Sequence, residues 1–310
     1  MRILVTGATG LLGTELCRQL GPLAQLLGWG RRLPEHPVSP RVTYEAVDVT
    51  NLEGVRSGLD RWRPQVVVHT AAMTDVDASE TQPSLAWEVN AKATQGLAES
   101  CRRVGAYLIA ISTDYVFDGA SARPYREEDP PHPINRYGES KLEGERLALA
   151  SASRVLVVRV SGLFGPARPN FVTLAIQRFR AGESLPAVTN QRISPSYTVD
   201  LAMGIGKLIT RYEKDPSQAE EGGALHGVLH LANSGGATRV EVAETVATSL
   251  GASMGLIHHL TWEEMNRPAK RPPQSQLDCS RFAQLTGSFL RPWEAAVKAF
   301  LDSEVLKNAS

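Results

Sequence analysis

The chain opens with the stretch Arg2-Ile3-Leu4-Val5-Thr6-Gly7-Ala8-Thr9-Gly10-Leu11-Leu12-Gly13, in which a short apolar run passes directly into a glycine-rich turn. The run suits a buried parallel strand, and the leucines at 12, 16 and 20 have helical spacing. In such a unit Gly7 permits the tight turn, Gly10 lets the backbone approach a pyrophosphate, and Gly13 lets the helix pack on the strand. The helix N-terminus then faces the phosphates. We therefore predict a dinucleotide site that also includes Thr9, Leu11 and Leu12; an ordinary glycine loop is the alternative.

Length and composition limit the classes of function that the rest of the chain can have. Its 310 residues suit one large or two modest domains, and 33 basic residues balance 33 acidic ones. No global field therefore favours nucleic acid or an anionic membrane. Cys17, Cys101 and Cys279 lie singly, without metal or disulfide spacing, and a strand at residue 2 leaves no room for a signal peptide. We expect a cytoplasmic protein with no membrane span.

Strand-like runs alternate with helical periodicity through the first half of the chain. The strands are expected at Val42–Val47, Val66–His69, Tyr107–Ser112 and Val155–Val160, and the helices at Leu85–Val104 and Tyr137–Ala150. This alternation predicts an α/β fold with a doubly wound parallel sheet of the Rossmann type. Ligands in such sheets gather at the carboxyl ends of the strands, so we expect the loops there to form one crevice.

A change of pattern near residue 163 predicts a second, smaller lobe. Prolines 166, 169, 186 and 195 interrupt short helical stretches there. We expect a Rossmann domain over residues 1–162, to which segments near 190–235 return, and a mainly substrate-binding lobe over 163–310. Within it, Leu229–Ala232 has the pattern of a strand and Arg239–Leu250 that of an amphipathic helix. Proline stiffens residues 267–273, which are predicted to form an ordered loop over the crevice.

Tyr137 and Lys141 are four residues apart and would share one face of a helix. A free tyrosine has a pKa of about 10, and a nearby cation favours its ionised form. At an effective dielectric of ~20 the attraction is up to about 4 kcal/mol at ~4 Å, enough to lower a pKa by roughly two or three units. The pair is therefore a candidate acid/base centre, although the same spacing also occurs on solvated helix edges.

Two arginines stand where an NAD-binding protein would carry an acid for the ribose hydroxyls. Arg31 and Arg32 follow the glycine turn by about twenty residues, and no carboxylate stands beside them. Guanidinium groups can meet a 2'-phosphate with short charge-assisted hydrogen bonds. The sequence thus favours NADP(H), with NAD(H) as the alternative cofactor and a solvent-exposed basic loop as the non-functional interpretation.

Several ordered motifs resemble those of the extended short-chain dehydrogenase/reductases, and within them the dTDP-4-dehydrorhamnose reductases. The resemblance covers nearly the whole chain. The runs that carry it are Thr6–Gly13, Ser112–Gly119, Tyr125–Asp129, Pro133–Lys141, Asp200–Ala202 and Lys270–Pro272.

The resemblance implies a set of residue roles. Tyr137 would donate a proton to a sugar carbonyl while NADPH delivers hydride, and Lys141 would bind the nicotinamide ribose and lower the pKa of the tyrosine. Thr113 would hydrogen-bond the reacting oxygen. The remaining cofactor-binding residues would be Asp48, Val49, Ala71, Ala72 and Asn90, and those near the substrate Thr74, Asp114 and Tyr115.

The second lobe should supply cations for a nucleotide diphosphate, since arginine forks match phosphate oxygens. The candidates are Arg192, Arg267, Lys270 and Arg271, with surface solvation as the rival interpretation; Arg192 and Arg271 are our predicted substrate-binding residues.

Two positions depart from the family pattern. Gly162 stands where these reductases commonly place a tryptophan against the sugar, so the pocket is wider or filled differently. Val199 stands where some members have an acid that binds magnesium at a subunit interface. We therefore predict no metal, and the adjacent pair His258-His259 is poorly placed to share one ion.

The leading hypothesis is an NADPH-dependent reductase of a nucleotide-linked 4-keto-deoxysugar, most directly dTDP-4-dehydro-L-rhamnose. The alternatives are a nucleotide-sugar epimerase or dehydratase, and an NADP-binding regulatory subunit resembling the beta subunit of methionine adenosyltransferase. A dehydratase usually adds an acidic pair beside the active-site threonine, and Thr113-Asp114-Tyr115 supplies one acid. The expected partners are a nucleotide-sugar substrate and a second copy of the chain as a homodimer.

Overall fold

The opening apolar run forms β1 (Arg2–Thr6), an interior strand of a seven-stranded parallel sheet. The computed structural model describes residues 1–308, with side chains as far as residue 304. The strand order is β10-β6-β5-β4-β1-β2-β3, so the chain winds outward from β1 in one direction and then in the other. The predicted doubly wound sheet is confirmed. Its order reverses between β1 and β4, which is where open α/β sheets bind ligands.

The elements of this first unit are as follows. The other strands are β2 (Gln25–Gly30), β3 (Val42–Ala46), β4 (Val66–His69), β5 (Tyr107–Thr113), β6 (Val155–Val160) and β10 (Gly227–His230). The helices around them are α1 (Leu11–Leu20), α2 (Leu52–Trp62), α3 (Val76–Thr81), α4 (Pro83–Trp87), α5 (Ala93–Val104), α6 (Arg136–Ser151) and α8 (Thr198–Lys214). β10 begins two residues before the predicted run and pairs in parallel with β6 at the sheet edge.

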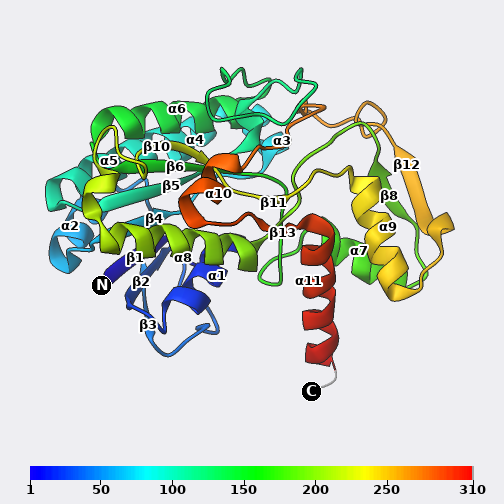
Figure 1. The fold of residues 1–310 in the computed structure, drawn as a ribbon, viewed down its shortest axis with the longest axis horizontal. Helices are drawn as coiled ribbons and strands as arrows, with labels where there is room; N and C mark the ends of the chain where they lie inside the picture. The colour runs from blue at the N-terminus through cyan, green and yellow to red at the C-terminus, as the bar shows by residue number, and fades with distance from the viewer. Residues whose placement is uncertain (309–310) are drawn as a thin grey trace.

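Alternate residues of β1 enter two different cores, as the two-residue period of a strand requires. Ile3 and Val5 lie in a core shared with α1 and α8, whereas Leu4 lies in one shared with α2 and α5. Figure 1 shows α1 and α8 on one side of the sheet and α4, α5 and α6 on the other. Burial on both faces explains why the strands are continuously apolar.

The second lobe has a separate hydrophobic core. The remaining elements of the chain are β7 (Leu163–Phe164), α7 (Phe171–Arg180), β8 (Leu185–Val188), β9 (Ser196–Tyr197), β11 (Asn233–Ser234), α9 (Arg239–Leu250), β12 (Ile257–Leu260), α10 (Ser280–Thr286), β13 (Leu290–Pro292) and α11 (Trp293–Asn308). Of these, α10 and β13 place Phe282 and Leu290 in the first core. α7, α9 and α11 pack together with the parallel pair β8–β12. α7, α9, α11 and the β8–β12 pair occupy the right-hand part of Figure 1.

The helix predicted over Leu85–Val104 is interrupted. α4 ends at Trp87, a π-helical turn spans Glu88–Lys92, and α5 begins at Ala93. Such turns are rare and often occur at functional sites. Here the turn buries Asn90, and α6 packs so closely on it that a β-carbon at Gly144 would lie 2.2 Å from the Asn90 carbonyl oxygen.

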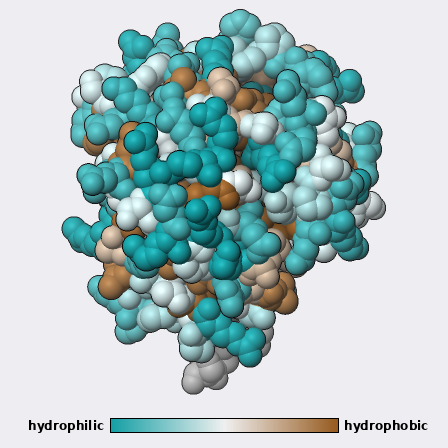
Figure 2. All heavy atoms as spheres, turned by 90° about the vertical axis from the view of Figure 1, so that its left-hand side faces the viewer, coloured by the Kyte–Doolittle hydropathy of each residue, from teal (hydrophilic) through white to brown (hydrophobic). Residues whose placement is uncertain are grey.

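The surface offers no broad apolar face in the view of Figure 2, where hydrophobic side chains form small separate clusters among hydrophilic ones. The large apolar side chains that are exposed are spread along the chain; Leu23 lies between α1 and β2, and Phe289 between α10 and β13. Within residues 1–308, no helix combines the length and apolarity needed to cross a membrane.

Candidate active site

The glycine turn between β1 and α1 is as tight as the sequence predicts. Gly7 has a positive φ of 67°, and a β-carbon there would lie 2.7 Å from the Ala71 amide nitrogen. A β-carbon at Gly13 would lie 2.1 Å from the Gly7 carbonyl oxygen, so α1 packs directly on the turn. α1 begins without a capping side chain or an acid in its first turn. Its free amides therefore suit an anion.

Arg168, which the sequence did not single out, lies at the same turn. Its guanidinium donates to the Thr9 carbonyl oxygen through Nε at 3.1 Å and Nη2 at 2.8 Å. Arg168 comes from the segment after β7, so only the fold brings this cation to the glycine turn.

Arg31 and Arg32 follow β2 next to the turn. Both are exposed, and neither forms an ion pair with the side chains that the structure describes. The β2 end contacts the turn, since a β-carbon at Gly30 would lie 3.3 Å from Thr9 Oγ1. Asp48 accepts hydrogen bonds from Thr50, which lower the pKa of the carboxyl, and the charge of Arg31 lowers it further. The arginines are thus free to meet an anion.

Asn90 ties the loop after β4 to α6. The Asn90 amide accepts from the Met73 nitrogen at 2.9 Å and donates to the Met73 oxygen at 3.1 Å and to Ser140 Oγ at 3.0 Å. It thereby ties the Ala71-Ala72 segment to α6. Cofactor contacts of Ala71, Ala72, Val49 and Asn90 stay predictions, and the side-chain amide of Asn90 is committed to the protein itself.

Thr113 and Tyr137 meet at the carboxyl end of β5. The Thr113 hydroxyl acts on the Tyr137 phenol, whose pKa it lowers, and accepts from the Tyr115 amide at 3.2 Å. Tyr137 lies in the first turn of α6, whose N-cap Asn135 accepts from the Gly138 nitrogen at 2.8 Å. The fold therefore brings together the hydroxyls that the motifs predicted as catalytic.

The predicted lowering of the Tyr137 pKa by Lys141 is wrong for this structure. Burial raises the pKa of Tyr137 above its usual value of about 10, the Thr113 hydrogen bond opposes this, and the Asp114 charge adds to it. Lys141 Nζ donates to the Ile111 carbonyl oxygen at 2.7 Å. Helical spacing places the pair on one face, but the ammonium is directed to β5.

Lys141 is buried beside a second charge, Glu145, one helical turn later. Burial lowers the pKa of Lys141 to about 8, and the Glu145 charge opposes that shift. Glu145 itself pairs with buried Arg159 at 2.7 Å and accepts from Ser112. A cavity of ≈ 10 Å³ lies among Lys141, Glu145 and Asn90, which is room for about one water. Lys141 therefore occupies a polar interior, not the helix surface.

Asp114 is engaged with protein hydroxyls. Its carboxylate accepts from Ser275 at 2.5 Å, Ser161 at 2.9 Å and Thr113 at 3.1 Å. Burial raises its pKa to about 6 against these three hydrogen bonds. Asp114 fixes the Thr113 side chain, and its predicted contact with a sugar stays a prediction.

Tyr115 connects this centre to the second lobe. Its ring packs edge-on against Tyr137 with centroids 5.8 Å apart, and its hydroxyl accepts from Gln191 Nε2 at 3.3 Å. Gln191 Oε1 in turn accepts from Trp262 Nε1 at 3.0 Å. Gln191 and Trp262 were not predicted, because nothing in their local sequence indicates that they meet Tyr115.

The predicted substrate cations are already paired. Arg271 binds Asp77 at 2.6 and 2.9 Å, and Arg192 binds Glu241 at 3.1 Å and the Gly236 oxygen at 2.7 Å. Thr74 is exposed beside this region. A further arginine, Arg239, lies over the Trp262 ring at 6.0 Å and was missed by the sequence analysis.

Position 162 is filled differently from the family pattern. Gly162 has a φ of 55°, and a β-carbon there would lie 2.6 Å from Ile193 Cδ1. Ile193 thus occupies the space that a larger side chain at position 162 would need.

Val199, which stands where some family members have a metal-binding acid, packs against the second core, and His258 and His259 are adjacent on β12. In the part of the chain that the structure describes, no three His, Cys, Asp or Glu side chains gather as metal ligands.

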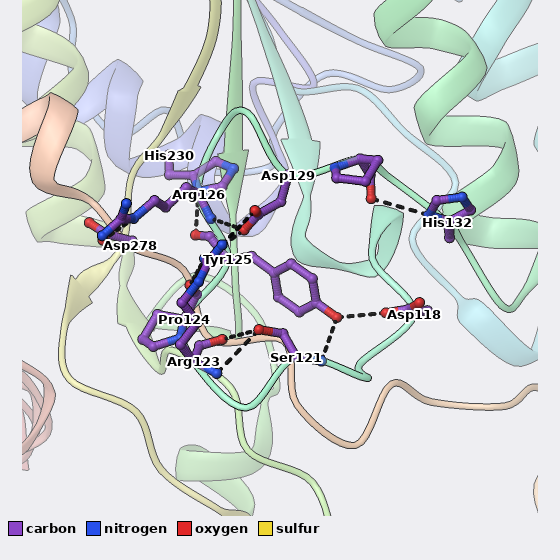
Figure 3. A network of polar contacts seen from close by, with 11 residues as sticks. Asp118, Ser121, Arg123, Pro124, Tyr125, Arg126, Asp129, His132, His230 and Asp278 are labelled. Atoms are coloured by element: carbon purple, nitrogen blue, oxygen red, sulfur yellow. Dashed lines mark hydrogen bonds and ion pairs between the residues drawn. The ribbon is translucent and has the colours of Figure 1, made fainter.

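The Tyr125–Asp129 run is structural. The Tyr125 hydroxyl donates to Asp118 at 2.6 Å, and the Arg123 guanidinium donates to both carboxylate oxygens of Asp129 at 2.8 Å (Figure 3). The Arg123 hydrogen bonds hold the pKa of Asp129 at about 2. His230 of β10 lies 3.1 Å from the Tyr125 carbonyl oxygen. These contacts order the loop that leads into α6.

Known proteins match this chain along nearly all of its length. The family model described as the RmlD substrate binding domain matches residues 1–306. A dTDP-4-dehydrorhamnose reductase of Streptomyces griseus is 37% identical over 300 residues, with 96% of this chain and 91% of that protein covered. Methionine adenosyltransferase 2 subunit beta of Xenopus laevis is 30% identical over 305 residues, covering 97% and 87%. The crystal structure of a dTDP-4-dehydrorhamnose reductase of Bacillus anthracis in complex with NADP superposes with a TM-score of 0.85 at 30% identity, covering 97% and 99%.

Proposed function

The chain belongs to the RmlD substrate-binding family, and from that premise we propose that it is an NADPH-dependent reductase of a nucleotide-linked 4-keto-deoxysugar, with dTDP-4-dehydro-L-rhamnose as the first candidate substrate. The observation that carries the proposal is the approach of Thr113 to Tyr137 at the carboxyl end of β5, where the Thr113 hydroxyl lowers the pKa of the phenol, with Lys141 one turn further along α6. The similarity to proteins named as dTDP-4-dehydrorhamnose reductases supports the substrate class.

The residues fit a dinucleotide. The uncapped start of α1 offers its amides to a pyrophosphate, and the unpaired Arg31 and Arg32 suit a 2'-phosphate. The bound NADPH supplies the hydride that reduces the carbonyl carbon.

The raised pKa of Tyr137 suits a proton donor. At neutral pH the phenol keeps its proton until negative charge develops on the substrate oxygen, which then takes that proton and becomes the hydroxyl of the product. Thr113 orients the phenol. With a pKa of about 8, Lys141 is mostly charged at neutral pH, and its role in this proposal is to bind the nicotinamide ribose.

The alternatives find less support in this chain. A dehydratase would need carboxyl groups that face the sugar, whereas Asp114 is buried and bonded to protein hydroxyls. The regulatory alternative draws on the similarity to methionine adenosyltransferase 2 subunit beta. The shared Tyr125–Asp129 run does not favour that alternative, because its side chains order a loop.

The test is to follow NADPH oxidation with a panel of dTDP- and UDP-linked 4-keto sugars, using Tyr137→Phe as the control. Turnover with a member of the panel, lost in the variant while NADPH still binds, supports the reductase. If no sugar is turned over and the chain instead forms a stable complex with a methionine adenosyltransferase catalytic subunit, the regulatory alternative replaces it.

A further inference from the structure

Glu145 lies one helical turn after Lys141 on α6, and both side chains are buried. Within residues 1–304 the Glu145 carboxylate forms its ion pair with buried Arg159 of β6, not with Lys141. The Arg159 guanidinium donates to both carboxylate oxygens, through Nε at 3.0 and 3.2 Å and through Nη2 at 2.7 Å, and the Ser112 hydroxyl donates to one of them. All of these groups are donors, which suits an ionised carboxylate fixed in one place.

The Lys141 ammonium and the Glu145 carboxylate face a common space. In the described part of the chain, the ammonium donates its one hydrogen bond to the Ile111 carbonyl oxygen of β5, at 2.7 Å. The cavity of ≈ 10 Å³ is lined by both charged side chains and by Ser112. An ammonium has three donors, so Lys141 keeps two for groups that the protein itself does not supply.

Three ionisable groups on the elements packed together here surround this space or border it. They are His69 of β4, Arg159 of β6 and Glu145 of α6 itself. Burial, and then the Lys141 charge, lower the pKa of His69 to about 3, so this ring is neutral, and both its nitrogens contact threonine hydroxyls. β5 and the π-helical turn contribute uncharged side chains to the cavity. Among these groups Glu145 is the negative charge that offsets the cost of burying the ammonium.

We propose that Glu145 is a positioning residue: its carboxylate, held by Arg159, keeps the buried Lys141 ammonium protonated and in place to bind the nicotinamide ribose. Tyr137, Lys141 and Glu145 then act as three residues at successive four-residue steps along one face of α6. The charge of Lys141 follows from contacts within the chain, whereas the ribose as its ligand rests on the proposed function.

The experiment measures the pKa of Lys141 in the full chain without cofactor, by NMR of the ε-carbon of isotopically labelled lysine. The resonance is assigned by its loss in Lys141→Arg. Glu145→Gln should lower this pKa by about one pH unit, because the negative charge is removed and Arg159 is left without its counter-ion. A merely structural role predicts the opposite sign, since a loosened interior admits water and raises the pKa toward the usual value of about 10.4.

The matched control is Glu143→Gln, which removes a carboxylate of the same helix that pairs with Arg146 at 3.9 Å. It should leave the Lys141 pKa unchanged. If Glu145→Gln alone does not fold, the double variant Glu145→Gln/Arg159→Gln removes both buried charges and should still lower the pKa, because the Glu145 charge acts on Lys141. An unchanged or raised Lys141 pKa in the folded variant would overturn the proposal.

Turnover separates this inference from the proposed function. The pH above which kcat/KM falls should move down in Glu145→Gln by as much as the Lys141 pKa does. If the Lys141 pKa falls but neither chain reduces a keto sugar, the role of Glu145 in charging Lys141 stands and the reductase proposal falls. If both chains reduce a keto sugar and lose activity at the same pH, the reductase stands and Glu145 has no such role.

Discussion

The proposed cofactor side and the proposed substrate side of this site are built in different ways. On the proposed cofactor side, one continuous stretch forms a turn whose glycines let backbone atoms approach within contact distance. On the proposed substrate side, side chains such as Tyr115, Gln191 and Trp262 contact one another from three distant segments. Backbone recognition leaves a local pattern in the sequence, whereas side-chain recognition across a fold leaves none.

Tyr137→Phe removes the proposed proton donor, which lies between the proposed cofactor and substrate sides. It should have the largest effect on kcat/KM. Removing the proton donor should lower kcat/KM by about 10²- to 10⁴-fold. The ring remains to pack against Tyr115, so the affinities for NADPH and dTDP should change by less than threefold. Steady-state kinetics and titrations of each ligand measure this. A variant that keeps a tenth of the activity would show that another group supplies the proton.

The double variant Arg31→Ala/Arg32→Ala changes only the proposed cofactor side, by removing the two arginines expected to bind the 2'-phosphate. Loss of charge-assisted hydrogen bonds to a 2'-phosphate should weaken NADPH binding by about 10- to 100-fold and leave NADH binding as it was. Fluorescence titration with both cofactors measures the difference. Arg41→Ala, an exposed arginine of the same β2–β3 connection, is the control. An equal loss for both cofactors would contradict the assignment to the 2'-phosphate.

The pH profile tests the positive charge of Lys141 near Tyr137, the proposed catalytic tyrosine. The pKa of Lys141 is lowered to about 8, so its positive charge is present below that pH and is lost as the pH rises through it. We expect kcat/KM, which reports the free enzyme, to fall about tenfold per pH unit above about pH 8. In Lys141→Arg the cation persists and this limb should move to higher pH. If kcat/KM stays constant from pH 7 to 10, the charge of Lys141 has no role in the reaction.

Tyr125→Phe tests whether the Tyr125–Asp129 run is structural and should have the smallest effect on activity of the four changes. It removes the 2.6 Å hydrogen bond to Asp118 but keeps the ring that stacks on Phe117 at 4.1 Å. The free energy of unfolding should fall by about 0.5–1.5 kcal/mol, measured by urea denaturation. kcat/KM should change by less than twofold. A large loss of activity would instead place this loop in the substrate site.

Local patterns predicted most of the fold but not its irregularities. The doubly wound sheet followed from apolar runs that alternate with helical segments, and the predicted limits of Arg239–Leu250 match α9. The π-helical turn at Glu88–Lys92 was not predicted, because it depends on the packing of α6 against Asn90. β2 was also not identified, since the glycines of its short run obscure the strand pattern.

The residues of the candidate site were also predicted only in part. Thr113, Tyr137 and Lys141 were found as motif residues, and the fold brings them to one strand end. The expected effect of Lys141 on the Tyr137 pKa was wrong, because spacing along a helix fixes a face and not the direction of a flexible side chain. Arg168 and Arg239 were missed because only long-range packing gives them their places.

The sequence by itself determined the parts of this protein whose physics is local: the strand and glycine turn at residues 2–13, and the helix that carries Tyr137 and Lys141. Tertiary structure alone decided which charges are neutralised. Arg192 and Arg271 each pair with a carboxylate through the fold, and Arg239 pairs with none among the side chains of residues 1–304, because ion pairing depends on distances between segments that are remote in sequence.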